Sequence, residues 1–290
     1  MIDLSGARIA AIAPSGAYQP ALLSAGLDIA REAGFDVELF ADTLSPHRYL
    51  AAPDAQREAH LVEALRNPKW DAVWVIRGGY GITRLLPRLP WDELQPKPVI
   101  GFSDVTALFA GLWRHRPGAL VHGPKLHSLQ NTDTSSRAAT FQLLSGHAAP
   151  EWQGTALVPG RAEGPLVGGN LAMLAALCGT PWQLDARGCV LALEDVGEAP
   201  YRIDRLITQL RHSGGLDGVV GVALGEFQGC NPPANADWSL RDVLREAFAD
   251  IPTVADLPFG HGAQNHPFVW GEQVELDGDR LTRMSAASSR

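Results

Sequence analysis

The sequence predicts an α/β protein, and three observations lead to that prediction. Short apolar runs alternate with longer amphipathic segments through the first half of the chain. Glycine-containing turns follow several of these runs, as they do at the ends of strands. Hydrophobic residues make up 46% of the 290 positions and charged residues 19%, which supplies a sizeable core. Strand–helix alternation at this spacing is typical of a mostly parallel sheet with helices on both faces.

In the first half, the apolar runs predict strands and the amphipathic segments predict helices. The expected strands are residues 7–13, 35–40, 71–76 and 98–101, and the expected helices are residues 20–33, 53–66 and a segment ending at His115. We therefore expect residues 1–118 to form a Rossmann-like N-terminal domain, a mostly parallel sheet flanked by helices. Ligands of such sheets bind at the carboxyl ends of the strands, where residues 14–16, 77–81 and 102–104 fall.

The second half has a different pattern. Residues 119–164 are expected to be a connector containing one helix near 134–145, because Pro, Gly, Ser, Thr and Gln are frequent and periodicity is weak. Residues 165–290 are expected to form a C-terminal mixed α/β domain. Its expected elements are a glycine turn at 167–170, a helix to about 177, strand 188–193, helix 200–212, strand 218–224, helix 239–249 and short strands after 252.

Composition excludes some classes of function. Lys and Arg total 24 against 32 Asp and Glu, and this net charge of -8 argues against a general nucleic-acid binder. The three cysteines lack zinc-ligand spacing, and a sparse, odd count suits a reducing compartment. The N-terminus has no signal-peptide pattern, and no stretch approaches about 18 apolar residues. We expect a cytoplasmic protein without membrane association.

The strongest local signal for chemistry is the segment Gly101-Phe102-Ser103-Asp104-Val105, which joins an expected strand to an expected helix. Such a sharp turn can project a serine hydroxyl and place the next backbone N–H at an oxyanion. The segment departs from GxSxG because Val105 takes the final glycine position. Taken alone, it favours the alternative that Ser103 or Asp104 caps the following helix.

A serine nucleophile needs a base, and the base needs an orienting group. His261, which lies between two glycines, is the candidate base. Glu194 directly follows an apolar run and is the candidate acid, with Glu198 four residues away as the alternative. We expect Asp195 and Glu198 to cap the helix that starts near Pro200.

The loop Arg77-Gly78-Gly79-Tyr80-Gly81 can cradle an anion with its backbone N–H groups. It lacks the Walker lysine and does not match GxGxxG. If Ser103 is a nucleophile, Gly79 N–H can supply an oxyanion donor beside that of Asp104.

The histidine pairs do not indicate a metal site. His122 and His127, like His261 and His266, are five residues apart and so do not share one helical face. No HExxH motif accompanies them. We expect no metal and no other cofactor.

Six segments, taken together, resemble the LD-carboxypeptidase family of serine peptidases, which includes murein tetrapeptide carboxypeptidases and microcin-immunity peptidases. They occur in the family's order and span nearly the whole chain. The matching segments are Ala13-Pro14-Ser15-Gly16, Arg77-Gly78-Gly79-Tyr80-Gly81, Ile100-Gly101-Phe102-Ser103-Asp104, Val167-Gly168-Gly169-Asn170, Leu193-Glu194-Asp195 with Tyr201-Arg202-Ile203-Asp204-Arg205, and Pro258-Phe259-Gly260-His261-Gly262.

The resemblance implies a triad of Ser103, Glu194 and His261, with the nucleophile in the N-terminal domain and the acid and base in the C-terminal domain. It implies a muropeptide stem tetrapeptide as substrate, cut between the L-centre of a diamino acid and the terminal D-alanine during murein recycling. It also implies a homodimer and no metal. Arg77, Arg202 or a backbone N–H cluster can hold the terminal carboxylate, and Tyr80 is a further candidate for substrate binding.

Three alternatives have distinct signatures. The microcin-immunity branch cleaves aminoacyl-nucleotide amides and would use stacking aromatics such as Trp182 and Trp238. A non-catalytic α/β module that binds a small ligand is compatible with the same fold. A cysteine amidotransferase needs a cysteine at the strand-to-helix turn, where Ser103 stands instead.

Overall fold

The computed structural model describes residues 2–115 and 118–284. The chain divides into two compact units: one contains the residues up to Ala149 with Asn265–Pro267, and the other contains Pro150–Gln264 and the residues from Phe268 onward. Residues 119–164 contribute elements to both units. The domain boundaries expected from the sequence stay a prediction.

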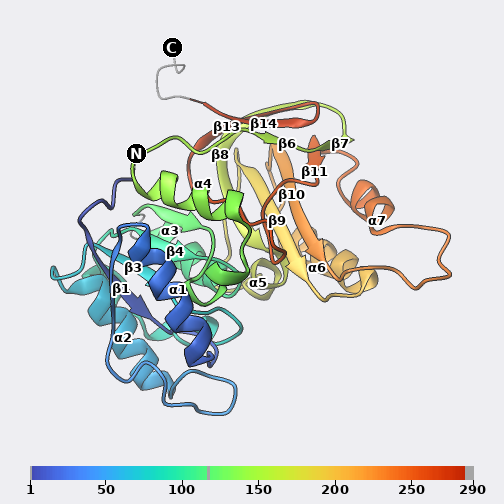
Figure 1. The fold of residues 1–290 in the computed structure, drawn as a ribbon. Coiled ribbons are helices and arrows are strands. Elements are labelled where there is room, and N and C mark those ends of the chain that lie inside the picture. The colour runs from blue at the N-terminus through green and yellow to red at the C-terminus, as the bar shows by residue number, and fades with distance from the viewer. Residues whose placement is uncertain (1, 116–117, 285–290) are drawn as a thin grey trace. The chain divides into compact units, whose positions relative to one another are not determined.

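A parallel sheet is the centre of the first unit, with strands in the order β5-β4-β3-β1-β2. Its strands are β1 (Arg8–Ile12), β2 (Asp36–Leu39), β3 (Ala72–Val75), β4 (Val99–Gly101) and β5 (Leu120–His122). Helices surround these strands (Figure 1): α1 (Pro20–Glu32), α2 (Asp54–Arg66), α3 (Val105–His115) and α4 (Thr134–Leu144). The connections contain 3-10 turns η1 (Ile82–Arg84), η2 (Leu86–Arg88), η3 (Trp91–Glu93) and η4 (Leu126–Asn131). The fully buried β3 and β4 explain the continuous apolar runs of the sequence.

The second unit contains a mixed sheet with the order β6-β14-β13-β8-β9-β10-β11-β7. Its central strands β8 (Arg161–Asn170), β9 (Val190–Val196), β10 (Gly221–Gln228) and β11 (Thr253–Ala255) are parallel. The antiparallel flanks are β6 (Trp152–Gln153), β7 (Thr155–Val158), β13 (Gln273–Asp277) and β14 (Arg280–Arg283). The remaining elements are α5 (Leu171–Ala176), α6 (Pro200–His212), α7 (Leu240–Ala247) and β12 (Phe268–Val269). The two sheets confirm the expected α/β class.

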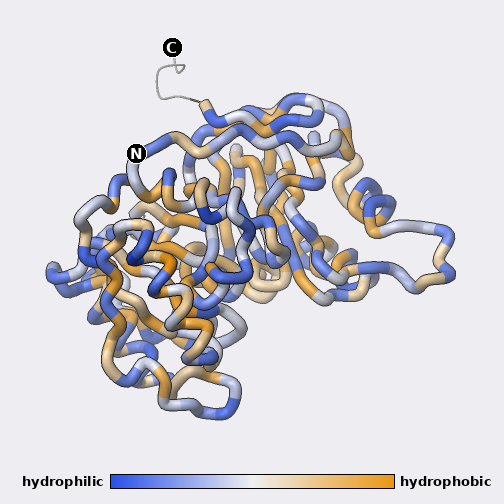
Figure 2. The backbone as a smooth tube through the Cα atoms, in the orientation of Figure 1, coloured by the Kyte–Doolittle hydropathy of each residue, from blue (hydrophilic) through white to orange (hydrophobic). Residues whose placement is uncertain are grey.

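Each unit buries its own core, and Figure 2 shows hydrophobic segments in both units. Leu61 and Trp74 are fully buried in the first unit. In the second, the rings of Trp152 and Phe259 stack with centroids 5.3 Å apart, and Phe268 meets Phe259 edge-on at 5.4 Å. Among the described residues, no helix has both the length and the apolar character needed to cross a membrane.

Two regions differ from the sequence-based expectation. The expected connector 119–164 contains strands β5, β6 and β7 besides its helix α4, because its short apolar segments pair with neighbouring strands. The expected glycine turn at Val167–Asn170 is the end of the ten-residue strand β8. A Cβ at Gly168, where φ is +118°, would lie 2.2 Å from the carbonyl oxygen of Ala192. Gly168 therefore allows the backbones of β8 and β9 to approach closely. Glycine inside a strand often marks such a close approach, as well as a bulge or bend.

Candidate active site

Ser103 lies on a sharp turn between β4 and α3, and its backbone is in the left-handed region with φ of +69°. Such a conformation is uncommon for any residue other than glycine and costs about 1–3 kcal/mol, so surrounding structure must hold it. The Thr106 N–H donates to the Ser103 carbonyl oxygen at 2.9 Å, which ties the turn to the first residues of α3. This strained strand-to-helix geometry is that of a nucleophile elbow.

The glycine loop after β3 lies directly against this turn. A Cβ at Gly78 would be 3.0 Å from the Cβ of Ser103 and 3.2 Å from its Oγ. The Gly16 N–H donates to the Gly78 carbonyl oxygen at 3.0 Å, so the segment 14–16 joins the same group. The first unit thus brings together the three loops that the sequence placed at the carboxyl ends of its strands.

The Asp104 side chain binds the loop after β3 instead of capping α3. It is 1% exposed, and its Oδ2 accepts a hydrogen bond from the Ile82 N–H at 3.0 Å. Burial raises the pKa of Asp104, while hydrogen bonds and the charge of Arg57 oppose that rise. No sequence pattern indicated this contact, because its partners lie 22 positions apart.

Glu194 and His261 meet in the second unit. Glu194 near the end of β9 has a fully buried side chain, and its Oε2 lies 2.6 Å from Nδ1 of His261, whose side chain is 14% exposed. The loop that carries His261 is fixed to β10 by hydrogen bonds from Leu257 N–H to the Leu224 carbonyl and from Glu226 N–H to the Phe259 carbonyl. Because β10 pairs with β9, this anchoring brings the histidine to the carboxylate.

Asn170 is a site residue that sequence reasoning missed. Its Nδ2 donates to Glu194 Oε1 at 3.3 Å and to Asp195 Oδ1 at 3.2 Å, so one amide holds two buried carboxylates. Its position in the sequence could have indicated this role, because Asn170 is a polar residue directly after an apolar run. In the structure that run is the end of β8, which pairs with the strand of Glu194. Burial raises the pKa of Asp195, and the Glu194 charge adds to this rise.

The expected capping of α6 by Asp195 or Glu198 is wrong. Helix α6 begins after Ala199, which makes no side-chain capping bond. Asp195 instead accepts from the Ala172 N–H of α5 at 2.9 Å, because the end of β8 and the start of α5 lie beside β9. Glu198 Oε2 forms an ion pair with Arg202 at 3.4 Å.

The expected substrate-binding residues lie in different units. In the first, Arg77 Nη1 donates to the Ala17 carbonyl oxygen, and the Tyr80 ring is 43% exposed and 5.7 Å from the Tyr49 ring. In the second, Arg202 is exposed on α6 beside Glu198. Each therefore has a local partner within its own unit.

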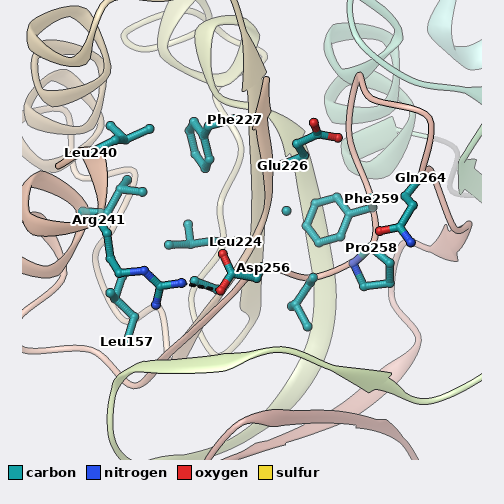
Figure 3. Close-up of a pocket in the computed structure, with 14 residues that line it drawn as sticks. Leu157, Leu224, Glu226, Phe227, Leu240, Arg241, Asp256, Pro258, Phe259 and Gln264 are labelled. Carbon is teal, nitrogen blue, oxygen red and sulfur yellow. Dashed lines mark hydrogen bonds and ion pairs between the residues drawn. The ribbon is translucent and has the colours of Figure 1, made fainter. Parts of the chain in front are cut away.

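A pocket of about 380 Å³ lies on the second unit beside the loop that carries His261 (Figure 3). Both polar and apolar residues form its wall, and Arg241 and Asp256 form an ion pair on one side. Leu257, Pro258 and Phe259 line it just before the histidine, whereas Glu194 and His261 are not among its lining residues. The pocket therefore lies next to the histidine loop but is not formed by the Glu194–His261 pair.

Family models match most of the chain. Residues 9–123 match the model of the LD-carboxypeptidase N-terminal domain, and residues 163–276 match that of the LD-carboxypeptidase C-terminal domain. The chain belongs to the LD-carboxypeptidase family. This LD-carboxypeptidase is a serine-type carboxypeptidase and thus a hydrolase.

Similar proteins agree with this assignment over nearly full length. A putative carboxypeptidase of Synechocystis sp. is 40% identical over 96% of this chain and 93% of its own length. The murein tetrapeptide carboxypeptidase of Pseudomonas aeruginosa is 38% identical over 94% of both chains. The crystal structure of muramoyltetrapeptide carboxypeptidase from Oxalobacter formigenes has a TM-score of 0.83 and 29% identity, and the match covers 94% of this chain and 97% of that one.

Proposed function

We propose that this LD-carboxypeptidase releases the terminal D-alanine from muropeptide stem tetrapeptides, by cleaving its amide bond to the L-centre of a diamino acid. The observation that carries the proposal is the buried Glu194 carboxylate against Nδ1 of His261 at 2.6 Å. A carboxylate in that place fixes the imidazole tautomer, so that Nε2 is the nitrogen that acts as base. The P. aeruginosa relative named for murein tetrapeptides supports the substrate class.

In the proposed mechanism, Ser103 Oγ attacks the scissile carbonyl carbon while His261 Nε2 takes the hydroxyl proton. Glu194 stabilises the imidazolium that forms. The backbone N–H groups of Gly79 and Asp104 receive the oxyanion. His261 then gives its proton to the departing amine of D-alanine, and water, deprotonated by the same histidine, hydrolyses the acyl-enzyme.

The free carboxylate of the substrate needs a cation or a group of N–H donors, and Arg77 and Arg202 are the candidates. We expect replacement of the responsible arginine by methionine to raise KM with a smaller effect on kcat, because uniform binding is lost. The same variant should also show a weaker preference for substrates with a free C-terminus over substrates with an amidated C-terminus. Murein recycling, a cytoplasmic location and a homodimer are further parts of this proposal.

The test is D-alanine release from L-Ala-D-Glu-diaminopimelate-D-Ala by wild type and by Ser103→Ala, with and without a chelator. Release that survives the chelator and disappears in Ser103→Ala is expected. Release stopped by the chelator alone would contradict a metal-free mechanism. No release by folded wild type, with cleavage of an aminoacyl-nucleotide amide instead, would replace the substrate by that of the microcin-immunity branch.

A further inference from the structure

A buried arginine connects three loops of the first unit. Arg57 on α2 is 1% exposed. Its guanidinium donates to the carbonyl oxygens of Pro14, Ala52 and Gly81, the last two at 3.1 Å each, and it pairs with Asp54. A planar group with five donors is suited to such divergent bonding, and lysine cannot reproduce it. Arg57 thus ties the loop after β1 to the glycine loop after β3.

Asp104 completes the connection from the nucleophile turn. Its Oδ2 accepts from the Ile82 N–H at 3.0 Å, one residue beyond the carbonyl that Arg57 binds. The hydroxyl of Ser15, also fully buried, opposes the rise in the pKa of this carboxyl group that burial causes. The glycine loop is therefore held at its end from two sides, by the guanidinium of Arg57 on α2 and by the carboxyl group of the residue after Ser103.

Two buried polar side chains are an expensive way to hold a loop, because burial removes their hydrogen bonds to water. Apolar side chains of similar volume often give equal or greater stability than a buried ion pair. The two side chains instead fix the orientation of the loop, because each hydrogen bond requires one particular carbonyl or N–H group of the loop to be in place. The loop that they orient is the one in which Gly78 lies against Ser103.

We propose that Arg57 and Asp104 are positioning residues that hold the loop Gly78–Ile82 against the Ser103 turn. They thereby preset the backbone N–H groups of Gly79 and Asp104 as oxyanion donors. The assignment of those donors rests on the proposed function. The Asp104 side chain acts through the loop, separately from its own backbone N–H.

The kinetic test compares Asp104→Ala and Asp104→Asn with wild type. We expect Asp104→Ala to lower kcat by about 10- to 100-fold through misplaced donors, with KM changed by less than about twofold. Asp104→Asn should recover most of kcat, because its amide oxygen can accept from Ile82 N–H. The control is Leu61→Ala, a fully buried position one turn along α2 from Arg57, which we expect to lower stability by removing apolar packing.

Hydrogen exchange tests whether Asp104 holds the loop, separately from whether the loop sets the oxyanion donors. The amide of Ile82 should be protected in wild type and in Leu61→Ala below its unfolding temperature, and should exchange faster in Asp104→Ala. Unchanged exchange, or a kcat loss equal to that of Leu61→Ala, would overturn the positioning role. If wild type releases no D-alanine, the assigned donors fall with the proposed function, and exchange at Ile82 alone decides whether the loop is held by Asp104.

Discussion

Glu194 Oε2 and His261 Nδ1 lie 2.6 Å apart although the residues are separated by 67 positions. Strand pairing explains this closeness, since β9 carries the acid and β10 anchors the histidine loop. Contacts this short are typical of hydrogen bonds in which one partner is charged. The pair distinguishes Glu194 from Glu198, whose carboxylate lies beside Arg202 instead.

Glu194→Gln should therefore remove most activity while leaving the fold intact. An amide can present its NH₂ to Nδ1 and stabilise the wrong tautomer, and we expect kcat to fall roughly 10³- to 10⁴-fold. Steady-state kinetics on the tetrapeptide would measure this. Glu198→Gln is the matched control and should keep kcat near the wild-type value, and the reverse ranking would make Glu198 the triad acid.

Gly78→Ala should impair the nucleophile more than the fold. The added methyl group would lie 3.0 Å from Ser103 Cβ and 3.2 Å from its Oγ, and must push the serine aside. A displacement of this kind can cost about 100-fold in kcat. Gly34→Ala is the control, because its φ of +92° makes the substitution strained while no atom lies within 4 Å of the new Cβ. Equal kcat values for the two variants would contradict the expected push on Ser103.

Arg283→Met should destabilise the second unit. Arg283 Nε lies 3.2 Å from Glu272 Oε2, both side chains are largely buried, and the guanidinium lies 4.5 Å from the Trp152 ring centroid. Burial raises the pKa of Glu272 and lowers that of Arg283, so each depends on the other for charge balance. Loss of one partner should cost about 3 kcal/mol of unfolding free energy, measured with urea.

The double variant Arg283→Met/Glu272→Gln should recover a large part of that loss, because no unpaired charge remains. Arg187→Met breaks an exposed pair, with side chains 71% and 61% exposed, and should leave stability unchanged. A double variant no more stable than Arg283→Met would show that packing on Trp152, rather than charge balance, is what Arg283 contributes.

Asp54 should give an acid-dependent contribution to stability. Its hydrogen bond to Arg84 holds the pKa of Asp54 below the ordinary 3.8, with burial opposing and Arg57 assisting. A lowered folded-state pKa means that the ionised form stabilises the fold above the ordinary pKa. That advantage is lost as the pH falls through the lowered value.

The measurement is the free energy of unfolding of wild type and Asp54→Asn from about pH 7 to about pH 2.5. The difference should be constant in the upper part of this range and should shrink as the pH falls below 3.8. Asp28→Asn, at an exposed position on α1, controls for the change in net charge. A difference that does not shrink as the pH falls would show that the shape of the side chain, rather than its charge, accounts for the effect.

The sequence predicted β1, β3 and β4 well because each is an apolar run that ends in a recognisable turn, whereas β5 fell in the expected connector and was not predicted as a strand. It also identified Ser103, Glu194 and His261 as candidates, although their roles stay a prediction. It could not show that Gly168 lies against Ala192, since a glycine pair in a strand looks like one in a turn. The contacts of Arg57, Asp104 and Asn170 were hidden for a related reason: their partners come from other strands and loops, and only the folded topology brings them together.

The left-handed backbone of Ser103 has an evolutionary consequence. A glycine there would relieve a strain of about 1–3 kcal/mol. Part of this gain would be offset, because glycine gives the unfolded chain more conformational freedom. If Ser103 is the nucleophile, as proposed, the change most damaging to the chemistry would then be among the least damaging to folding. Quality control in the cell, which detects unfolded chains, would not remove such a variant. Selection for the reaction itself is therefore what would keep a serine at this position.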